Sequence, residues 1–402
     1  MEMLLASLLM VWGNLSAASS DVTFEQLVQA SLDSKNAIVE VQPGSATNGT
    51  KDPDKPAGPL DYLLPASKKD PEPNSPKVKG IYVTSHVAGG KKFDSLVNLL
   101  DKTELNAMVI DVKDDYGYIT FDTGNPELTN LGTTKKNIAD IHKLTATLQE
   151  HDIYPIGRIV VFKDSIYANM KPEQSYVSSN GTVWQNGRKE SFVNPYLKEI
   201  WDYNINVAKE AAKVGFKEIQ FDYVRFPEGF EKKADSLKYT KDDRSRIQVI
   251  SEFVKYAKEQ LEPLGVRVSV DIFGYAASVP AAEGIGQDFE TISANVDVIS
   301  PMIYPSHYSE GWFGAKVPDA APYQTINGAS IDTEKKLTRL KEMNIKPIIR
   351  PWIQDFTATW VKGHITYGKH ELEEQIRALK DNGVEEYLLW NAGNNYTEGV
   401  KF

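Results

Sequence analysis

Two aspartates stand where apolar stretches of this chain give way to polar loops. Asp222 closes the stretch 218–222, and Asp271 lies near the end of the stretch 266–272. A carboxylate in such a position is held at the rim of a parallel α/β barrel, where these folds keep their active residues. Two carboxyl groups there can cleave a glycosidic bond, one as acid and the other as nucleophile or base. Two carboxyl groups on adjacent strands can have either the short separation found in retaining enzymes or the longer separation found in inverting ones.

The ends of the other apolar stretches add aromatic rings, arginines and amides around this pair. Aromatic rings stack on the apolar faces of sugars, while carboxylates and amides bind hydroxyl groups. This mixture therefore favours a carbohydrate ligand over a nucleotide or an apolar one. The residues expected to bind substrate are Tyr82, Asp111, Arg158, Arg225, Tyr304, His307, Arg350, Trp352, Trp390 and Asn391, with Trp184 from a long loop after the third strand.

Several of these residues also have a structural interpretation. A single aspartate at a strand end can cap a helix, and the tryptophans either contact sugar or fill the top of the barrel. Arg158 and Arg350 either bind an anionic sugar or neutralise the aspartates. Arg225 is expected to pair with a carboxylate, with Asp222 as one candidate, which would favour the ionised form of that carboxylate.

The chain offers little support for metal or cofactor chemistry. It has six histidines and no His-x-His or His-Glu-x-x-His spacing, so a zinc hydrolase is disfavoured. Asp111, Asp114 and Asp115 could hold calcium, although Asp114 and Asp115 are better explained as solvated turn residues. A glycine-rich phosphate loop is missing as well. We therefore expect neither a metal site nor a cofactor.

The net charge and the absence of cysteine limit the kinds of partner and chemistry that this chain can have. The formal net charge is −10 and no long cluster of Lys or Arg occurs, so a nucleic acid or an anionic membrane would find no electrostatic footprint. The chain has no cysteine, which excludes disulfides and thiol nucleophiles. A polysaccharide or oligosaccharide substrate is the expected partner, with association to the cell wall or envelope as a further expectation.

Apolar stretches alternate with helical patterns along most of the chain, which indicates βα units and a parallel sheet. Eight strands are what a closed (β/α)8 barrel of the TIM type requires. The expected strands are 80–84, 107–112, 154–161, 218–222, 266–272, 296–303, 347–352 and 387–390. The expected helices are 93–103, 137–151, 197–214 with Asn194 as its cap, 240–261, 333–343 and 370–382. Few residues follow the last strand, so the eighth helix should be short or absent, and an open α/β sheet is the alternative fold.

The N-terminal part of the chain differs in composition from the rest. Residues 1–20 resemble an export signal without its basic flank, and 21–41 form a short helical segment. Residues 42–78 are rich in Pro, Gly and Lys and cannot bury enough apolar surface to offset the entropy of ordering, so they read as a linker. The barrel is then 79–402, and the protein is expected to be secreted or associated with the cell envelope.

Five motifs occurring in order carry a family resemblance. They are Gly-Ile-Tyr-Val-Thr at 80–84, Phe-Val-Asn-Pro-Tyr at 192–196, Ile-Gln-Phe-Asp-Tyr-Val-Arg-Phe-Pro at 219–227, Asp-Ile-Phe-Gly at 271–274 and Ser-Pro-Met-Ile-Tyr-Pro at 300–305. Together they resemble a bacterial family of glycoside hydrolase barrels first catalogued as a domain of unknown function, over residues 79–395. The resemblance implies a barrel distantly related to α-amylases and α-galactosidases, with Asp222 as nucleophile and Asp271 as acid. In α-amylases an arginine usually stands two residues before the nucleophile, where this chain has Gln220.

These observations predict a hydrolase of O-glycosidic bonds that acts on a bacterial surface or environmental polysaccharide. The alternative is a non-catalytic barrel that binds carbohydrate at the cell envelope and does not depend on the two aspartates. A carbohydrate deacetylase is a weaker alternative, because such enzymes usually need a metal site rich in histidine.

Overall fold

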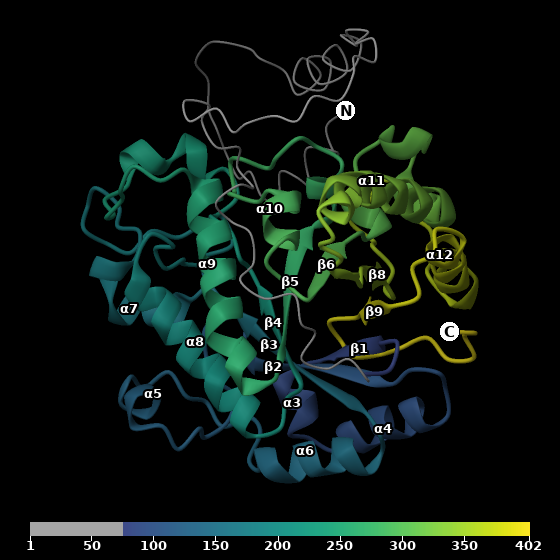
Figure 1. Ribbon diagram of the computed structural model, residues 1–402, viewed down its shortest axis with the longest axis horizontal. Helices are drawn as coiled ribbons and strands as arrows, with labels where there is room; N and C mark the ends of the chain where they lie inside the picture. The colour runs from purple at the N-terminus through teal and green to yellow at the C-terminus, as the bar shows by residue number, and fades with distance from the viewer. Residues whose placement is uncertain (1–74) are drawn as a thin grey trace, which may run out of the picture.

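The computed structural model describes residues 75–402, which form a closed parallel barrel surrounded by helices (Figure 1). The strands are β1 (Lys79–Val83), β2 (Ala107–Lys113), β3 (Tyr154–Val160), β4 (Glu218–Asp222), β5 (Arg267–Phe273), β6 (Val298–Met302), β7 (Ile348–Ile349), β8 (Trp352–Gln354) and β9 (Tyr387–Trp390). Parallel pairings of β1 with β9 and of β5 with β6 close the sheet on itself. The predicted barrel is therefore confirmed, and the open-sheet alternative is wrong.

The seventh strand position is split into two short pieces. β7 pairs with β6 at Val298 and Ile299, and β8 pairs with the end of the same strand at Met302. Arg350 and Pro351 lie between the two pieces. Proline has no N–H to donate to a ladder, so the strand breaks there and resumes one residue later. β7 and β8 thus count as one of the eight strand positions of the barrel.

The helices cover the outside of the barrel, with α8 and α9 on one flank in Figure 1, α4 and α6 below, and α11 and α12 opposite. They are α3 (Ser85–Ala88), α4 (Phe93–Asp101), α5 (Pro126–Asn130), α6 (Ile141–Glu150), α7 (Ser165–Met170), α8 (Lys198–Lys213), α9 (Arg246–Leu261), α10 (Phe289–Ser293), α11 (Pro322–Glu342) and α12 (Lys369–Asp381). Residues 391–402, which follow β9, form no helix, as expected. None of the helices within 75–402 is long and apolar enough to span a membrane.

Local sequence explains most of the helix starts. Asp140 caps α6, and Ser245 with Gln248 forms a reciprocal capping box at α9. Asn194 does not cap α8, contrary to expectation, because its side chain accepts the N–H of Tyr196 in a turn and donates to the carbonyl of Thr240. Helix α11 begins at Pro322, eleven residues earlier than the predicted start at residue 333, because proline is favoured in the first helical turn.

Alternation along each strand sorts the side chains between two apolar cores. A large core lies between the strands and the helices, and a smaller one fills the inside of the barrel. The inner core consists of Val78, Tyr82, Ala107, Val109, Tyr154, Ile156, Tyr304, Trp352 and Leu388. On β4 the alternate residues Glu218, Gln220 and Asp222 form the inward-facing column, because successive side chains point to opposite faces. All three are buried.

A buried ion network closes the amino-terminal end of the barrel. Arg350 Nη1 binds Oε1 of Glu218 at 2.7 Å, and Arg350 Nε binds Oε2 of Glu386 at 2.8 Å. Glu218 is the first residue of β4 and Glu386 immediately precedes β9, so this network lies opposite the carboxyl ends of the strands. Arg350 was expected among the residues that bind substrate at the mouth, but the structure places it at the barrel floor with no exposed surface.

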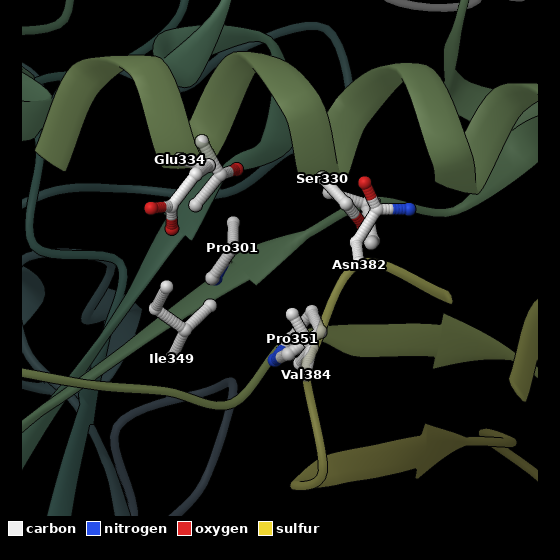
Figure 2. A pocket seen from close by; sticks show the side chains of 9 residues that line it. Pro301, Ser330, Glu334, Ile349, Pro351, Asn382 and Val384 are labelled. Carbon is white, nitrogen blue, oxygen red and sulfur yellow. The ribbon is translucent and has the colours of Figure 1, made fainter. Parts of the chain in front are cut away.

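A small hollow lies on the outer side of the sheet beneath α11 (Figure 2). It is lined by Pro301 in β6 and Ile303 just after it, by Ser330 and Glu334 on α11, and by Pro351 at the strand break. It contains none of the predicted site residues. The hollow is a packing gap between a helix and the broken strand.

The sequence-based expectations for the N-terminal part concern residues that the structure does not describe. The signal-like segment 1–20, the helical segment 21–41 and all but the last four residues of the linker 42–78 lie outside the described residues. Val78 is fully buried in the inner core, next to the start of β1.

Replacing Arg350 by Met should destabilise the protein by about 3–5 kcal/mol, because it leaves the carboxylates of Glu218 and Glu386 buried without their cation. The matched control is Arg339→Met, which removes a surface arginine 3.7 Å from Glu290 and should cost less than about 1 kcal/mol. Urea unfolding followed by circular dichroism would measure both. Equal effects would mean that the floor network contributes nothing beyond a surface pair.

Candidate active site

One arginine organises the carboxyl ends of β2, β3 and β4. Arg158 donates from Nε and Nη2 to Oδ2 of Asp222, at 3.0 and 2.6 Å. Its Nη1 donates to Oδ1 of Asp111 at 2.7 Å and to Oδ2 of Asp115 at 3.1 Å. Burial alone would lower the pKa of Arg158, but the surrounding aspartates raise it well above its ordinary value. The guanidinium is therefore a permanent cation that holds three carboxylates.

Tyr82 and Trp390 form one wall beside this arginine. The hydroxyl of Tyr82 donates to Oδ2 of Asp111 at 2.7 Å, and burial, opposed by Arg158, raises the pKa of Asp111 to about 6. The rings of Tyr82 and Trp390 stack with their centroids 4.2 Å apart, and the guanidinium of Arg158 lies within 6 Å of both. Trp390 is half-buried, so part of its ring faces the opening.

Asp271 lies beside Asp222 in a different environment. β4 and β5 pair in register up to Phe221 and Val270, which brings the next residue of each strand side by side. Nε1 of Trp352 donates to Oδ1 of Asp271 at 2.8 Å. Burial, reinforced by the negative charge of Asp222, raises the pKa of Asp271 well above its ordinary value. Asp222 is thus held by a cation, whereas Asp271 favours its protonated form.

Aromatic rings enclose the two aspartates from the β6 and β8 side. Tyr304 is buried, and after burial itself the nearby Asp271 and Asp222 are the largest causes that raise its pKa. The ring of Trp352 lies 5.5 Å from that of Trp390, nearly perpendicular to it. Trp352 is only 1% exposed, so it fills the barrel top and orients Asp271.

The chain turns sharply after Asp222. Tyr223 has a φ of 51°, a left-handed conformation that a bulky residue adopts only under constraint. Its N–H donates to Oδ1 of Asp222 at 2.6 Å, and its ring lies between the Nζ of Lys163 at 3.9 Å and the guanidinium of Arg225 at 4.8 Å. Lys163 in turn binds Asp115 at 2.6 Å. Tyr223 and Lys163 were not among the residues expected to bind substrate, and Asp115 was considered only as a calcium ligand or a solvated turn residue; the signal for all three was their position at strand ends.

Two residues predicted to bind substrate have partners other than Asp222 and Asp271. Arg225 binds Oε1 of Glu228 at 2.9 Å and lies over the ring of Phe273, so it does pair with a carboxylate, but the partner of Asp222 is Arg158. His307 is exposed, its Nδ1 lies 3.0 Å from the hydroxyl oxygen of Ser306, and its ring packs against Tyr304. It lies at the rim rather than against the aspartates.

Two further residues predicted to bind substrate stabilise loops. Asn391 donates from Nδ2 to the carbonyls of Asp355 and Asn395, at 2.6 and 2.7 Å, and so fixes the loop after β9. Trp184 packs against Tyr176 and Phe192 within the long loop after β3. The structure therefore brings neither side chain into the group around Asp222.

The aspartates considered for calcium do not converge. Oδ1 of Asp114 accepts the backbone N–H groups of Tyr116, Gly117 and Tyr118 and caps its own turn, while Asp111 and Asp115 face Arg158. Within residues 75–402, no group of three or more His, Cys, Asp or Glu side chains is arranged to hold a metal ion.

The fold and this group of residues define a TIM-barrel enzyme with an aspartate-rich site at the carboxyl ends of its strands. A family model described as "Putative glycosyl hydrolase domain" matches residues 80–396, and the chain belongs to this family. This places the protein among the glycoside hydrolases, with a carbohydrate as its class of substrate. A search of curated proteins gives no match.

Solved structures that match this chain include a hypothetical protein and several enzymes. A hypothetical protein from Ruminiclostridium thermocellum is 36% identical over 48% of this chain and 96% of its own, with a TM-score of 0.44. The spore cortex-lytic enzyme SleL of Bacillus cereus is 11% identical over 79% of this chain and 72% of its own, with a TM-score of 0.47. The α-galactosidase TtGalA of Thermus thermophilus is 9% identical over 85% of this chain and 66% of its own, with a TM-score of 0.49.

Replacing Asp271 by Asn should stabilise the protein increasingly as the pH rises. Folding raises the pKa of Asp271, so the native state keeps a proton that the unfolded chain releases. The free energy of unfolding of wild type therefore falls as the pH rises from the pKa of Asp271 in the unfolded chain to its pKa in the native state. The variant lacks this titration and keeps an acceptor for Trp352, so its advantage should grow by about 1.4 kcal/mol per pH unit. Unfolding at pH 4.5 and 6.5 would measure it, with the exposed Asp243→Asn as control. A constant difference would mean that Asp271 is ionised in the native protein.

Proposed function

We propose that this protein hydrolyses O-glycosidic bonds of a bacterial surface or environmental polysaccharide, with Asp222 and Asp271 as its catalytic pair. The observation that supports this best is the contrast between two neighbouring buried carboxyl groups. Asp222 accepts two hydrogen bonds from the cation of Arg158, while Asp271 favours its protonated form. Such a contrast separates the roles of base and acid in a carboxylate pair.

In this proposal Asp271 donates its proton to the glycosidic oxygen as the bond from that oxygen to the anomeric carbon breaks. Asp222 either attacks the anomeric carbon or removes a proton from the attacking water. If Asp222 attacks, water then breaks the bond between Asp222 and the anomeric carbon and gives its proton to Asp271; if Asp222 acts as base, it keeps the proton of the water, and exchange with solvent restores both carboxyl groups. Arg158 keeps Asp222 in place throughout, and Trp352 fixes the direction of Asp271 through its Nε1–H.

The walls of the site suit a sugar ring. Trp390, half-buried and stacked on Tyr82, and Tyr304 next to the aspartates offer aromatic surface to apolar faces of a pyranose. His307 is exposed at the rim, where it would contact a neighbouring sugar unit, whereas Arg225 is buried and supports the wall through Tyr223 and Phe273. Action on a polysaccharide outside the cell agrees with the signal-like segment 1–20 that the sequence predicts.

The charges at the mouth favour a neutral sugar or an amino sugar over a uronic acid. Every cation of the group already has a carboxylate partner, so the carboxylate of a uronic acid would have to displace one. The pairs are Arg158 with Asp111, Asp115 and Asp222, Lys163 with Asp115 and Glu190, Arg188 with Glu190, and Arg225 with Glu228. Arg158 thus neutralises aspartates, one of the two roles expected for it.

The substrate preference can be measured directly. We expect hydrolysis of neutral or amino-sugar polymers, such as laminarin, xylan or glycol chitosan, to exceed that of polygalacturonate and alginate by at least roughly tenfold, which corresponds to about 1.4 kcal/mol. Higher salt should narrow this gap, because it screens repulsion at the partly exposed carboxylates. Faster release of reducing ends from the polyuronates would contradict the charge argument.

Replacing Asp222 by Asn should lower turnover by roughly 10³-fold or more, because an amide can act neither as nucleophile nor as base. Reducing ends released from neutral, acidic and cell-wall polysaccharides measure this, with wild type and variant side by side. The matched control is Asp243→Asn, an exposed aspartate in the loop after β4, which should keep wild-type turnover. Binding of polysaccharide without release by both wild type and variant would support the non-catalytic alternative instead.

A further inference from the structure

The exposed aromatic side chains of the described residues gather at one end of the barrel. Between residues 75 and 402 the large hydrophobic side chains with substantial exposure include three aromatic ones: Tyr116 at 69%, Trp360 at 46% and Tyr275 at 36%. Tyr116 follows β2, Tyr275 follows β5 and Trp360 follows β8. Three loops distant in sequence thus each place one ring at the carboxyl ends of the strands, the end that holds Asp222.

Trp360 is connected to the site by a series of rings. The ring of Tyr304 lies 6.0 Å from that of Phe356, and Phe356 stacks on Trp360 at 5.9 Å with 20° between the planes. A ring held against a second ring loses little freedom when a ligand stacks on its other face, so the orientation of Trp360 is set before binding.

Tyr275 is held in the same way on the β5 side. Its ring stacks on Phe273 at 5.6 Å with 25° between the planes, and Phe273 lies over the guanidinium of Arg225. Gly274 between them lets the loop pass close to β6, because a Cβ there would come within 2.5 Å of the carbonyl oxygen of Met302. The loop therefore has a fixed path, and Tyr275 has a fixed direction.

Tyr116 lies on the opposite side of the mouth. In the sheet order, β3 and β4 separate β2 from β5, and β1 and β9 separate β2 from β8. Tyr116 directly follows Asp115, a partner of Arg158, and its carbonyl accepts the N–H groups of Ser165 and Ile166. The distance across an eight-stranded barrel is roughly 15 Å, which is longer than one monosaccharide.

We propose that Tyr116, Tyr275 and Trp360 are sugar-binding subsites on both sides of the aspartate pair, so that the enzyme binds an extended chain across the mouth and cleaves it internally. This inference rests on the proposed hydrolase function. The three rings come from three separate loops, after β2, β5 and β8. Single rings at intervals match a polymer that presents an apolar sugar face at each repeat, whereas a protein partner usually buries a continuous patch.

The test compares long and short substrates of one sugar. We first determine which of laminarin, xylan and glycol chitosan wild type hydrolyses fastest. That polymer and its own trisaccharide are then assayed with wild type and with the variants Trp360→Ala, Tyr275→Ala and Tyr116→Ala. We expect each variant to lose roughly tenfold in kcat/KM on the polymer, and at least fivefold more there than on the trisaccharide. Wild type should lower the viscosity of the polymer solution before many reducing ends appear. The control is Leu264→Ala, an equally exposed apolar residue before β5 at the opposite end of the barrel, which should match wild type.

The outcomes separate this inference from the function on which it rests. Equal losses on polymer and trisaccharide, or release of only mono- or disaccharides by wild type, would overturn the extended subsites while leaving hydrolysis intact. If no polymer is hydrolysed, the proposed function fails and the inference fails with it. Affinity electrophoresis of the Asp222→Asn protein in gels containing the hydrolysed polymer adds a readout independent of turnover. Retardation that the second change Trp360→Ala weakens supports the subsites, and retardation that it leaves unchanged opposes them.

Discussion

The buried guanidinium of Arg158 is the interaction on which the site depends. A charge with 1% exposure is strongly unfavourable unless its donors are matched by acceptors, and here Asp111, Asp115 and Asp222 supply them. These partners come from β4 and from β2 with its following loop, so the ion network requires β2, β3 and β4 to keep one register. A shift by one residue would turn Arg158 or Asp222 toward the helices. The strand register that forms the barrel is therefore also the register that assembles the site.

That constraint also separates the two carboxyl groups chemically. Arg158 lies on the β3 side of Asp222 and binds it directly, while Asp271 on β5 is buried and accepts the indole N–H of Trp352. Burial and the negative charge of Asp222 then favour a proton on Asp271. The strained backbone at Tyr223 belongs to the same arrangement, since its N–H binds the second oxygen of Asp222 and its ring is held between two cations. Position alone therefore gives the two carboxyl groups different environments, one bound to a cation and the other favouring a proton.

The sequence predicted the barrel and the strand-end aspartates, because apolar stretches and the residues after them are local features. It could not predict pairing across strands. The resemblance to α-amylases suggested an arginine at the position of Gln220, and Arg225 was the nearest candidate for Asp222. In the structure β3 and β4 pair Arg158 with Gln220, so the arginine reaches the same level of the barrel from the neighbouring strand. The prediction that Arg350 lies at the mouth was wrong for a related reason. The strand breaks at Pro351, which puts Arg350 level with Glu218, and a local sequence pattern does not show how deep in the barrel a residue lies.

The inward column of β4 shows how one strand serves both stability and function. Glu218 binds Arg350 at the floor, Gln220 contacts Ser300 in the middle, and Asp222 binds Arg158 at the top. Each end of the barrel interior is therefore closed by an arginine bound to carboxylates. The floor network has Glu218 fully buried, so its charges can only hold strands together. At the top, the side chain of Asp115 is 38% exposed and Trp390 is half-buried, so the same kind of network is open to solvent. Of the two networks, only the upper one is open to solvent, at the end of the barrel where the loops after β2, β5 and β8 carry exposed rings.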